Sequence, residues 1–168
     1  MRFTRVERLG FSEYVRTNRT DLDEDARSVR SNEDFCRRYF AFTSLEHDPG
    51  RERLYCGVTN FAGDLLYELD PASGAFRSLG YASMADGHEI KIHRGLWLGG
   101  DGCLYSATST LSNLDELAEA PGGKVFRYDP DQGRYDVLSV PCPHLYIQTV
   151  SLSPDGRTVC GMAYPAFD

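Results

Sequence analysis

The chain has 168 residues, a length that suits one domain of ordinary size. Hydrophobic residues make up 41% and charged residues 26%, which excludes a disordered chain, and no apolar run approaches the roughly 18 residues of a membrane span. The net charge is −7, and residues 41–168 carry 9 Lys and Arg against 17 Asp and Glu, so we expect neither nucleic acid nor an anionic membrane as a partner.

The N-terminal segment, residues 1–39, has no clear place in the pattern that organises the rest of the chain. Its run DLDEDARSVRSNED is polar and densely charged, which predicts a loop-like or partly ordered segment. The first residues, MRFTRVERLG, are not followed by the apolar stretch of a signal peptide. If this start is native, we expect a cytoplasmic location.

From about residue 40 onward the chain repeats one pattern, in which two apolar stretches flank a turn that contains Asp and Gly. Gly accepts a positive φ and Asp bonds to its own nearby backbone, so Asp-Gly between two apolar runs predicts a β-hairpin. Three segments share the pattern: YFAFTSLEHDPGRERLYCGVTN at 39–60, IKIHRGLWLGGDGCLYSATS at 90–109 and LYIQTVSLSPDGRTVCGMAY at 145–164.

A second unit follows each of the first two segments and predicts a strand, an Asp-Pro-x-x-Gly turn and another strand. An insertion before the later of these units has room for one helical turn at 113–120, too short to be stable alone. The two matching units are GDLLYELDPASGAFRSLG at 63–80 and GKVFRYDPDQGRYDVLSV at 123–140.

Each full repeat therefore contains four short strands over about 50 residues, which is within the range of β-propeller blades. We predict an all-β fold, a β-propeller-like array of four-stranded antiparallel blades with about two and a half blades and an incomplete ring. Residues 1–39 precede this partial propeller of residues 40–168, whose blades cover approximately 40–80, 89–140 and 145–168.

The runs LYCGVTNFAGDLLYELDPASGAF, PGGKVFRYDPDQG and SLSPDGRTV are similar to blade sequences of bacterial β-propellers. Over residues 40–168 the chain resembles the YVTN and virginiamycin B lyase-like propellers, and more broadly WD40-like and kelch-like repeats. These motifs specify turns and strands. The lyase-like resemblance implies metal- and histidine-based chemistry at the propeller mouth, but no residue of this chain matches such a motif.

The number of blades departs from that of closed propellers, which usually have four to eight. An open array leaves apolar faces and a strand edge without partners. Three interpretations remain open. The chain is a piece of a longer propeller, or it self-associates to complete a ring, or its strands form another β arrangement.

The five cysteines are odd in number and include no CxxC pair, so neither a disulfide framework nor a cysteine zinc site is expected. Cys56 and Cys160 lie within apolar runs. We predict that both are small buried side chains.

The candidate site lies on the first strand of each repeat, because the innermost strands of propeller blades line the central channel. In the run GHEIKIHRG, strand alternation predicts that Glu89, Lys91 and His93 share one face. Alternation places Ile90 and Ile92 on the opposite face.

His93 is the candidate catalytic base, because imidazole titrates near neutral pH. The candidate substrate-binding residues are Lys91, Arg94, His144 and Gln148, among which Arg94 and Gln148 occupy matching repeat positions. Lys or Arg could neutralise the carboxylate of a sugar acid. No histidine pair has an established metal spacing, so the cofactor is unknown, with a divalent metal kept open.

The sequence therefore favours a ligand-binding or catalytic propeller for a small molecule or carbohydrate, with a lyase or hydrolase mechanism as one form. The alternative is a non-catalytic protein-interaction scaffold, because a fold alone does not imply a function. Convergence of the candidate residues in one concave pocket would favour the first.

Overall fold

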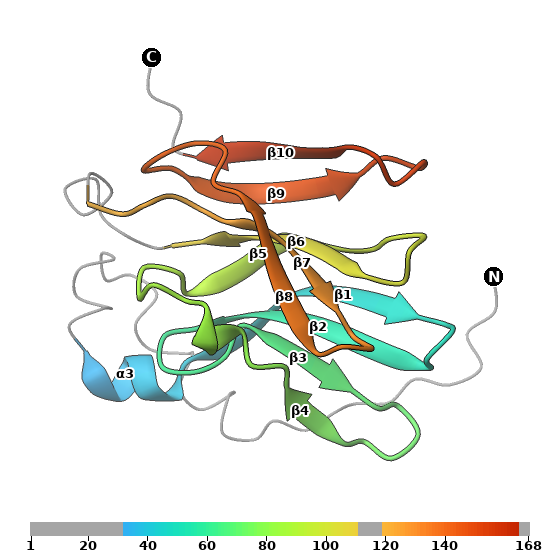
Figure 1. Cartoon of the computed structure of the whole chain (residues 1–168). Coiled ribbons are helices and arrows are strands. Elements are labelled where there is room, and N and C mark those ends of the chain that lie inside the picture. The colour runs from blue at the N-terminus through green and yellow to red at the C-terminus, as the bar shows by residue number, and fades with distance from the viewer. Residues whose placement is uncertain (1–31, 111–118, 165–168) are drawn as a thin grey trace.

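The computed structural model describes residues 32–110 and 119–164 (Figure 1). This part of the chain is all-β, as the sequence predicts, with antiparallel strands, one short helix and one 3-10 turn. None of its helices is long and apolar enough to cross a membrane. The strands are β1 (Phe40–Asp48), β2 (Arg53–Asn60), β3 (Leu66–Leu69), β4 (Phe76–Ser78), β5 (Lys91–Leu98), β6 (Leu104–Ser109), β7 (Val125–Asp129), β8 (Arg134–Ser139), β9 (Tyr146–Leu152) and β10 (Val159–Tyr164).

Eight strands form one curled antiparallel sheet in the order β4-β3-β2-β5-β6-β7-β8, with β1 paired to β2. The sheet consists of two meanders, β1–β4 and β5–β8, joined through the pair Thr59 and Lys91. Strands β9 and β10 form a separate two-stranded sheet. In Figure 1 the β9–β10 hairpin lies above β5 and β6, and these strands lie above β1 and β2.

The Asp-Pro-x-x-Gly turns have the same hydrogen bonds in both meanders. Asp70 Oδ1 accepts the backbone N–H groups of Ala72 and Ser73 at 2.9 and 3.3 Å. In the β7–β8 turn, Asp129 Oδ1 accepts those of the residues two and three positions later, at 3.0 and 3.1 Å. Gly74 and Gly133 end these turns with positive φ values of 73° and 61°. The predicted hairpins at both positions are confirmed.

The first hydrophobic core fills the space between the two meanders. Each fully buried large side chain contributes about 1.5–3 kcal/mol relative to an exposed one. A smaller second core lies between β5–β8 and the β9–β10 hairpin and contains Ala107, Val125, Ile147 and Val150. The members of the first core are Tyr55, Leu65, Leu66, Leu79, Tyr81, Ile92, Leu96, Leu104, Phe126 and Tyr128.

The short helix α3 (Glu33–Arg38) precedes the sheet, in a region where the sequence indicated a loop-like or partly ordered segment. Asn32 caps it, because its side chain accepts the Phe35 N–H at 2.9 Å. Acidic residues in its first turn and basic residues in its last turn also complement the helix dipole. We did not identify this cap from the sequence, because it lies in a densely charged run that indicated a loop.

Two other sequence predictions have different outcomes. Cys56 is buried, as expected, but Cys160 is exposed, so the prediction for Cys160 was wrong. Strand alternation gives the reason, since neighbouring Gly161 lines the inner side of the β9–β10 hairpin and Cys160 faces the other way. The helical turn expected at 113–120 lies outside the described residues, apart from the turn at 119–120.

Candidate functional site

Strand β5 is the first strand of the second meander and lies between β2 and β6 in the eight-stranded sheet. It pairs with β6 along Lys91–Ser109 and Ile92–Thr108, and it packs against β1 and β9. The β5–β6 register is irregular between Ile92 and Leu96, and Arg94 has a positive φ of 50° within this irregularity. A bulge of this kind re-aims neighbouring side chains. It brings Lys91, His93 and Arg94 into a group that we call the β5 basic cluster.

Lys91 is the most deeply buried member of this cluster, with 7% of the residue exposed. Its Nζ lies 5.6 Å from the centroid of the Tyr146 ring on β9, a cation–π arrangement. Within residues 32–110 and 119–164, no carboxylate forms an ion pair with it. Burial, together with the positive charge of Arg94, lowers the pKa of Lys91. The Lys91 ammonium is thus shielded from solvent, and no carboxylate among the described residues supplies a countercharge.

His93 lies in the same positive environment. Burial lowers its pKa to about 4, and the charges of Lys91 and Arg94 act in the same direction. The Nδ1 atom is buried and has no hydrogen-bond partner in the described part of the chain. At neutral pH the ring is therefore an uncharged imidazole. In the ligand-free protein it is a weak base, which limits the role of general base predicted for it.

Arg94 connects the cluster to the β9–β10 hairpin. Its carbonyl oxygen accepts a hydrogen bond from Thr149 Oγ1 at 2.7 Å, and its side chain is exposed. Gln148 is half-buried on β9 beside Thr149. No hydrogen bond between described residues joins Gln148 to Lys91 or His93.

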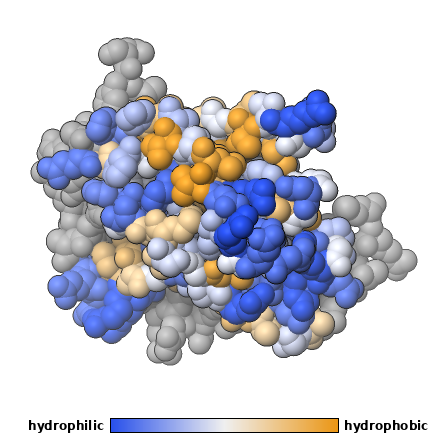
Figure 2. All heavy atoms as spheres, in the orientation of Figure 1, coloured by the Kyte–Doolittle hydropathy of each residue, from blue (hydrophilic) through white to orange (hydrophobic). Residues whose placement is uncertain are grey.

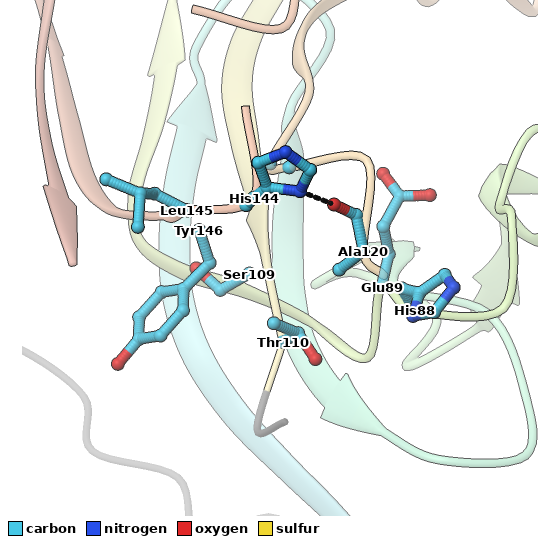
Figure 3. A pocket seen from close by; sticks show the side chains of 10 residues that line it. His88, Glu89, Ser109, Thr110, Ala120, His144, Leu145 and Tyr146 are labelled. Atoms are coloured by element: carbon cyan, nitrogen blue, oxygen red, sulfur yellow. Dashed lines mark hydrogen bonds between the residues drawn. The ribbon is translucent and has the colours of Figure 1, made fainter. Parts of the chain in front are cut away.

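His144 lies at a separate place. Its Nδ1 is 3.0 Å from the carbonyl oxygen of Ala120, and its backbone has a positive φ of 66°. In Figure 3 its ring points toward Ala120, while the Tyr146 side chain points away from it. The cavity beside it has a volume of about 10 Å³, room for a single water at most. The contact with Ala120 therefore holds the loop before β9 in place. His144 does not lie within the β5 basic cluster.

Glu89 does not share a face with Lys91 and His93, so this prediction from strand alternation was wrong. Its Oε1 accepts hydrogen bonds from Tyr81 Oη at 2.6 Å and from Thr108 Oγ1 at 2.7 Å. Its Oε2 accepts one from Lys124 Nζ at 2.8 Å. Glu89 precedes β5, where the alternation of an established strand does not apply, and these long-range partners determine the direction of its side chain.

The residues of the β5 basic cluster fit an anion better than a metal ion. Among the described residues, no three His, Cys, Asp or Glu side chains form a group that could hold a metal. The two cationic neighbours of His93 would also repel a divalent cation. In contrast, an ammonium and a guanidinium are the donors that bind carboxylates and phosphates.

The sequence places Tyr146 on the first strand of the third repeat, but the packing of its ring on Lys91 and the partners of Glu89 were not predicted from it. One compositional signal was present. Lys91 and Lys124 are the only two lysines of the chain. Both are largely buried, Lys91 beside Tyr146 and Lys124 beside Glu89. Their spatial partners are distant in sequence, so no local motif indicates them.

No family model matches the chain, and no match was found among curated proteins. Among solved structures, the chain is similar to the extracellular domain of a putative one-component system from B. thetaiotaomicron, with a TM-score of 0.47 and 14% sequence identity. The alignment covers 74% of this chain and 14% of that one, so this chain spans only a small part of that protein's length.

Proposed function

We propose that the chain is part of a β-propeller-like array that binds a small anionic molecule at the β5 basic cluster. The class that fits best is a carbohydrate bearing a carboxylate. Two four-stranded meanders with matching turn chemistry, followed by a further hairpin stacked on β5 and β6, support the arrangement of blades. The candidate residues on β5 and β9 then lie on the innermost strands.

The observation that carries the proposal is the buried, uncompensated ammonium of Lys91. A buried charge without a partner costs several kcal/mol unless it is neutralised or paired. An anionic ligand supplies the missing countercharge and also offers acceptors to the exposed guanidinium of Arg94. Tyr146 provides an aromatic surface beside the site, on which the apolar face of a sugar ring can pack.

A bound anion also changes the chemistry of His93. The pKa of this imidazole is low because of burial and because of two neighbouring positive charges. An anion at Lys91 and Arg94 offsets those charges, which raises the pKa toward its ordinary value and makes His93 a better proton acceptor. A lyase or hydrolase activity, with His93 as its base, would therefore depend on an anionic group in the substrate.

The experiment compares sodium D-glucuronate with neutral D-glucose by titration calorimetry on the full chain. We expect glucuronate to bind at least about tenfold more tightly, since a hydrogen bond to a charged group contributes about 1.5–3 kcal/mol. Lys91→Met should abolish this preference. Arg134→Met, which removes a positive charge from a side chain that is 57% exposed, should preserve it.

Loss of binding through unfolding can be recognised in the same variants. Removing a buried unpaired ammonium should leave the melting temperature of Lys91→Met unchanged or raise it, because the apolar chain of Met replaces a costly charge. Equal binding of glucose and glucuronate, or unchanged glucuronate binding by a folded Lys91→Met variant, would contradict the proposal.

The alternative function, a protein-interaction scaffold, is supported by a different feature. An apolar groove lies between β7–β8 and the β9–β10 hairpin, away from Lys91, His93 and Arg94. The two proposals use different surfaces, so each can be tested with the other left intact.

A further inference from the structure

The two lysines of the chain lie in opposite settings. Hydrophilic residues cover much of the face drawn in Figure 2, which is where charged side chains ordinarily lie. Both lysines are instead largely buried, since Lys91 is 7% exposed and the side chain of Lys124 is 14% exposed. A buried ammonium needs acceptors for its three N–H groups, so the contacts of each Nζ atom decide whether its charged form is favoured.

Lys124 Nζ has an acceptor for each of its three N–H groups. It lies 2.8 Å from Glu89 Oε2 and 3.0 Å from the carbonyl oxygen of Met84. The third acceptor is Asp86 Oδ2, at 3.2 Å. Two of the three acceptors are carboxylates, which favour the ammonium form. An ammonium has no lone pair, so Lys124 cannot attack a carbonyl carbon while these contacts persist.

Lys91 Nζ has an aromatic ring as its neighbour instead, because the centroid of the Tyr146 ring lies 5.6 Å away. Among residues 32–110 and 119–164, no oxygen accepts a hydrogen bond from this nitrogen, and no carboxylate pairs with it. Burial and the positive charge of Arg94 both act against the ammonium form. The Lys91 side chain is therefore the one of the two that favours an uncharged amine, whose lone pair is nucleophilic.

The other two members of the β5 basic cluster supply the groups that a reacting amine needs beside it. The exposed guanidinium of Arg94 is a donor for a carboxylate. The imidazole of His93 is uncharged at neutral pH, and its buried Nδ1 has no hydrogen-bond partner among the described residues. The charges of Lys91 and Arg94 both act on His93. One strand thus combines a nucleophile, a proton carrier and an anion donor.

We propose that Lys91 forms an imine with a short aldehyde or ketone that carries a carboxylate, a class that includes the open-chain form of a uronic acid. The inference rests on the proposed function, because the carboxylate takes the anion position beside Arg94. The Lys91 nitrogen attacks the carbonyl carbon to give a carbinolamine. His93 accepts the N–H proton and returns it to the leaving hydroxyl, so that water departs as the C=N bond forms. The small exposure of Lys91 restricts the ligand to a slender chain.

The test treats the full chain at neutral pH with sodium glyoxylate and sodium cyanoborohydride, which reduces an imine to a stable secondary amine. Cleavage at arginine places Lys91 in residues 78–94 and Lys124 in residues 95–127, so mass spectrometry measures the carboxymethyl label on each lysine separately. We expect at least about tenfold more label on Lys91, because each tenfold decrease in basicity leaves about ten times more of an amine uncharged. In the urea-unfolded chain the two lysines should be labelled equally.

Acetaldehyde, which lacks the carboxylate, separates this inference from the anion-binding proposal. The ratio of label on Lys91 to label on Lys124 should be smaller with acetaldehyde than with glyoxylate. Arg94→Gln should lower the glyoxylate ratio, and Arg134→Gln, at a side chain that is 57% exposed, should preserve it. Equal glyoxylate labelling of the two lysines in the folded chain would overturn the imine, even if glucuronate binds in calorimetry. Equal ratios with the two aldehydes, both favouring Lys91, would instead overturn the role of the carboxylate and leave the nucleophile standing.

Discussion

Glu89 and Lys124 form a buried ion pair in which Oε2 and Nζ are 2.8 Å apart. Their side chains are 3% and 14% exposed, and Asp86 lies 3.2 Å from the same ammonium. Burial alone would lower the pKa of Lys124, but the hydrogen bonds and charges of Glu89 and Asp86 outweigh it and raise the pKa. The pair joins the segment before β5 to the start of β7.

The stability losses from removing the two partners of this pair should not be additive. We expect Lys124→Met to lower the free energy of unfolding by about 3–5 kcal/mol, because it leaves the buried Glu89 carboxylate without its cation. Glu89→Gln should cost less, because Asp86 remains 3.2 Å from the Lys124 ammonium. The double variant should lose less than the sum of the two. Urea denaturation of the four proteins gives the coupling energy, and strict additivity would show that the pair is not coupled.

Gly95 should be intolerant of a side chain. A Cβ there would lie 2.6 Å from the backbone nitrogen of Val150 and 2.9 Å from its carbonyl oxygen, and neither atom can move without displacing β9. Gly95→Ala should therefore destabilise the protein by about 1–3 kcal/mol and increase amide exchange in the β9–β10 hairpin.

Gly100 is the matched control for this substitution. A Cβ at Gly100 meets no atom within 4 Å, and Gly100→Ala should change stability by no more than about 0.5–1 kcal/mol. If the two variants unfold at the same denaturant concentration, β9 does not pack closely on β5.

His93 should contribute a pH dependence to stability. Its pKa is about 4 in the folded protein and near 6.5 in the unfolded chain, so the unfolded state binds more protons between these values. The stability should therefore fall as the pH decreases from 6.5 to 4, by up to about 3 kcal/mol from this residue. Denaturant unfolding at several pH values should show a shallower decline for His93→Leu. The exposed control His47→Leu should retain the wild-type decline, and identical profiles for all three proteins would contradict the buried setting of His93.

Arg51 should stabilise the packing between the meanders. Its guanidinium pairs with Asp48 at 2.6 Å and with Asp131 at 2.8 Å, and it donates to the carbonyl oxygen of Gly102 at 3.2 Å. These partners come from three different turns. Lysine cannot reproduce the forked geometry, so Arg51→Lys should cost about 1 kcal/mol, and part of this loss should disappear in high salt. Arg134→Lys, whose side chain is mostly exposed, should cost less, and an equal loss would indicate a generic charge effect.

The turns could be predicted because their chemistry is local. Asp70 and Asp129 bond to backbone groups two and three residues ahead, and Gly74 and Gly133 adopt the positive φ that each turn needs. Such interactions are contained within a few residues of sequence. The all-β class and the hairpins follow from them, whereas the pairing of β2 with β5, which joins the two meanders in one sheet, does not.

The sequence by itself therefore determined the strands, their turns and the placing of Lys91, His93 and Arg94 on one strand. Only the tertiary structure decided that Glu89 turns away to Lys124, that His144 bonds to Ala120 apart from the cluster, and that Tyr146 covers Lys91. The physical reason is the separation of the partners. Glu89 and Lys124 lie 35 residues apart, and the direction of each side chain depends on which strands pack against it. A period-two pattern specifies that neighbouring side chains point to opposite faces, but the packing of distant strands decides which face is buried and what it meets.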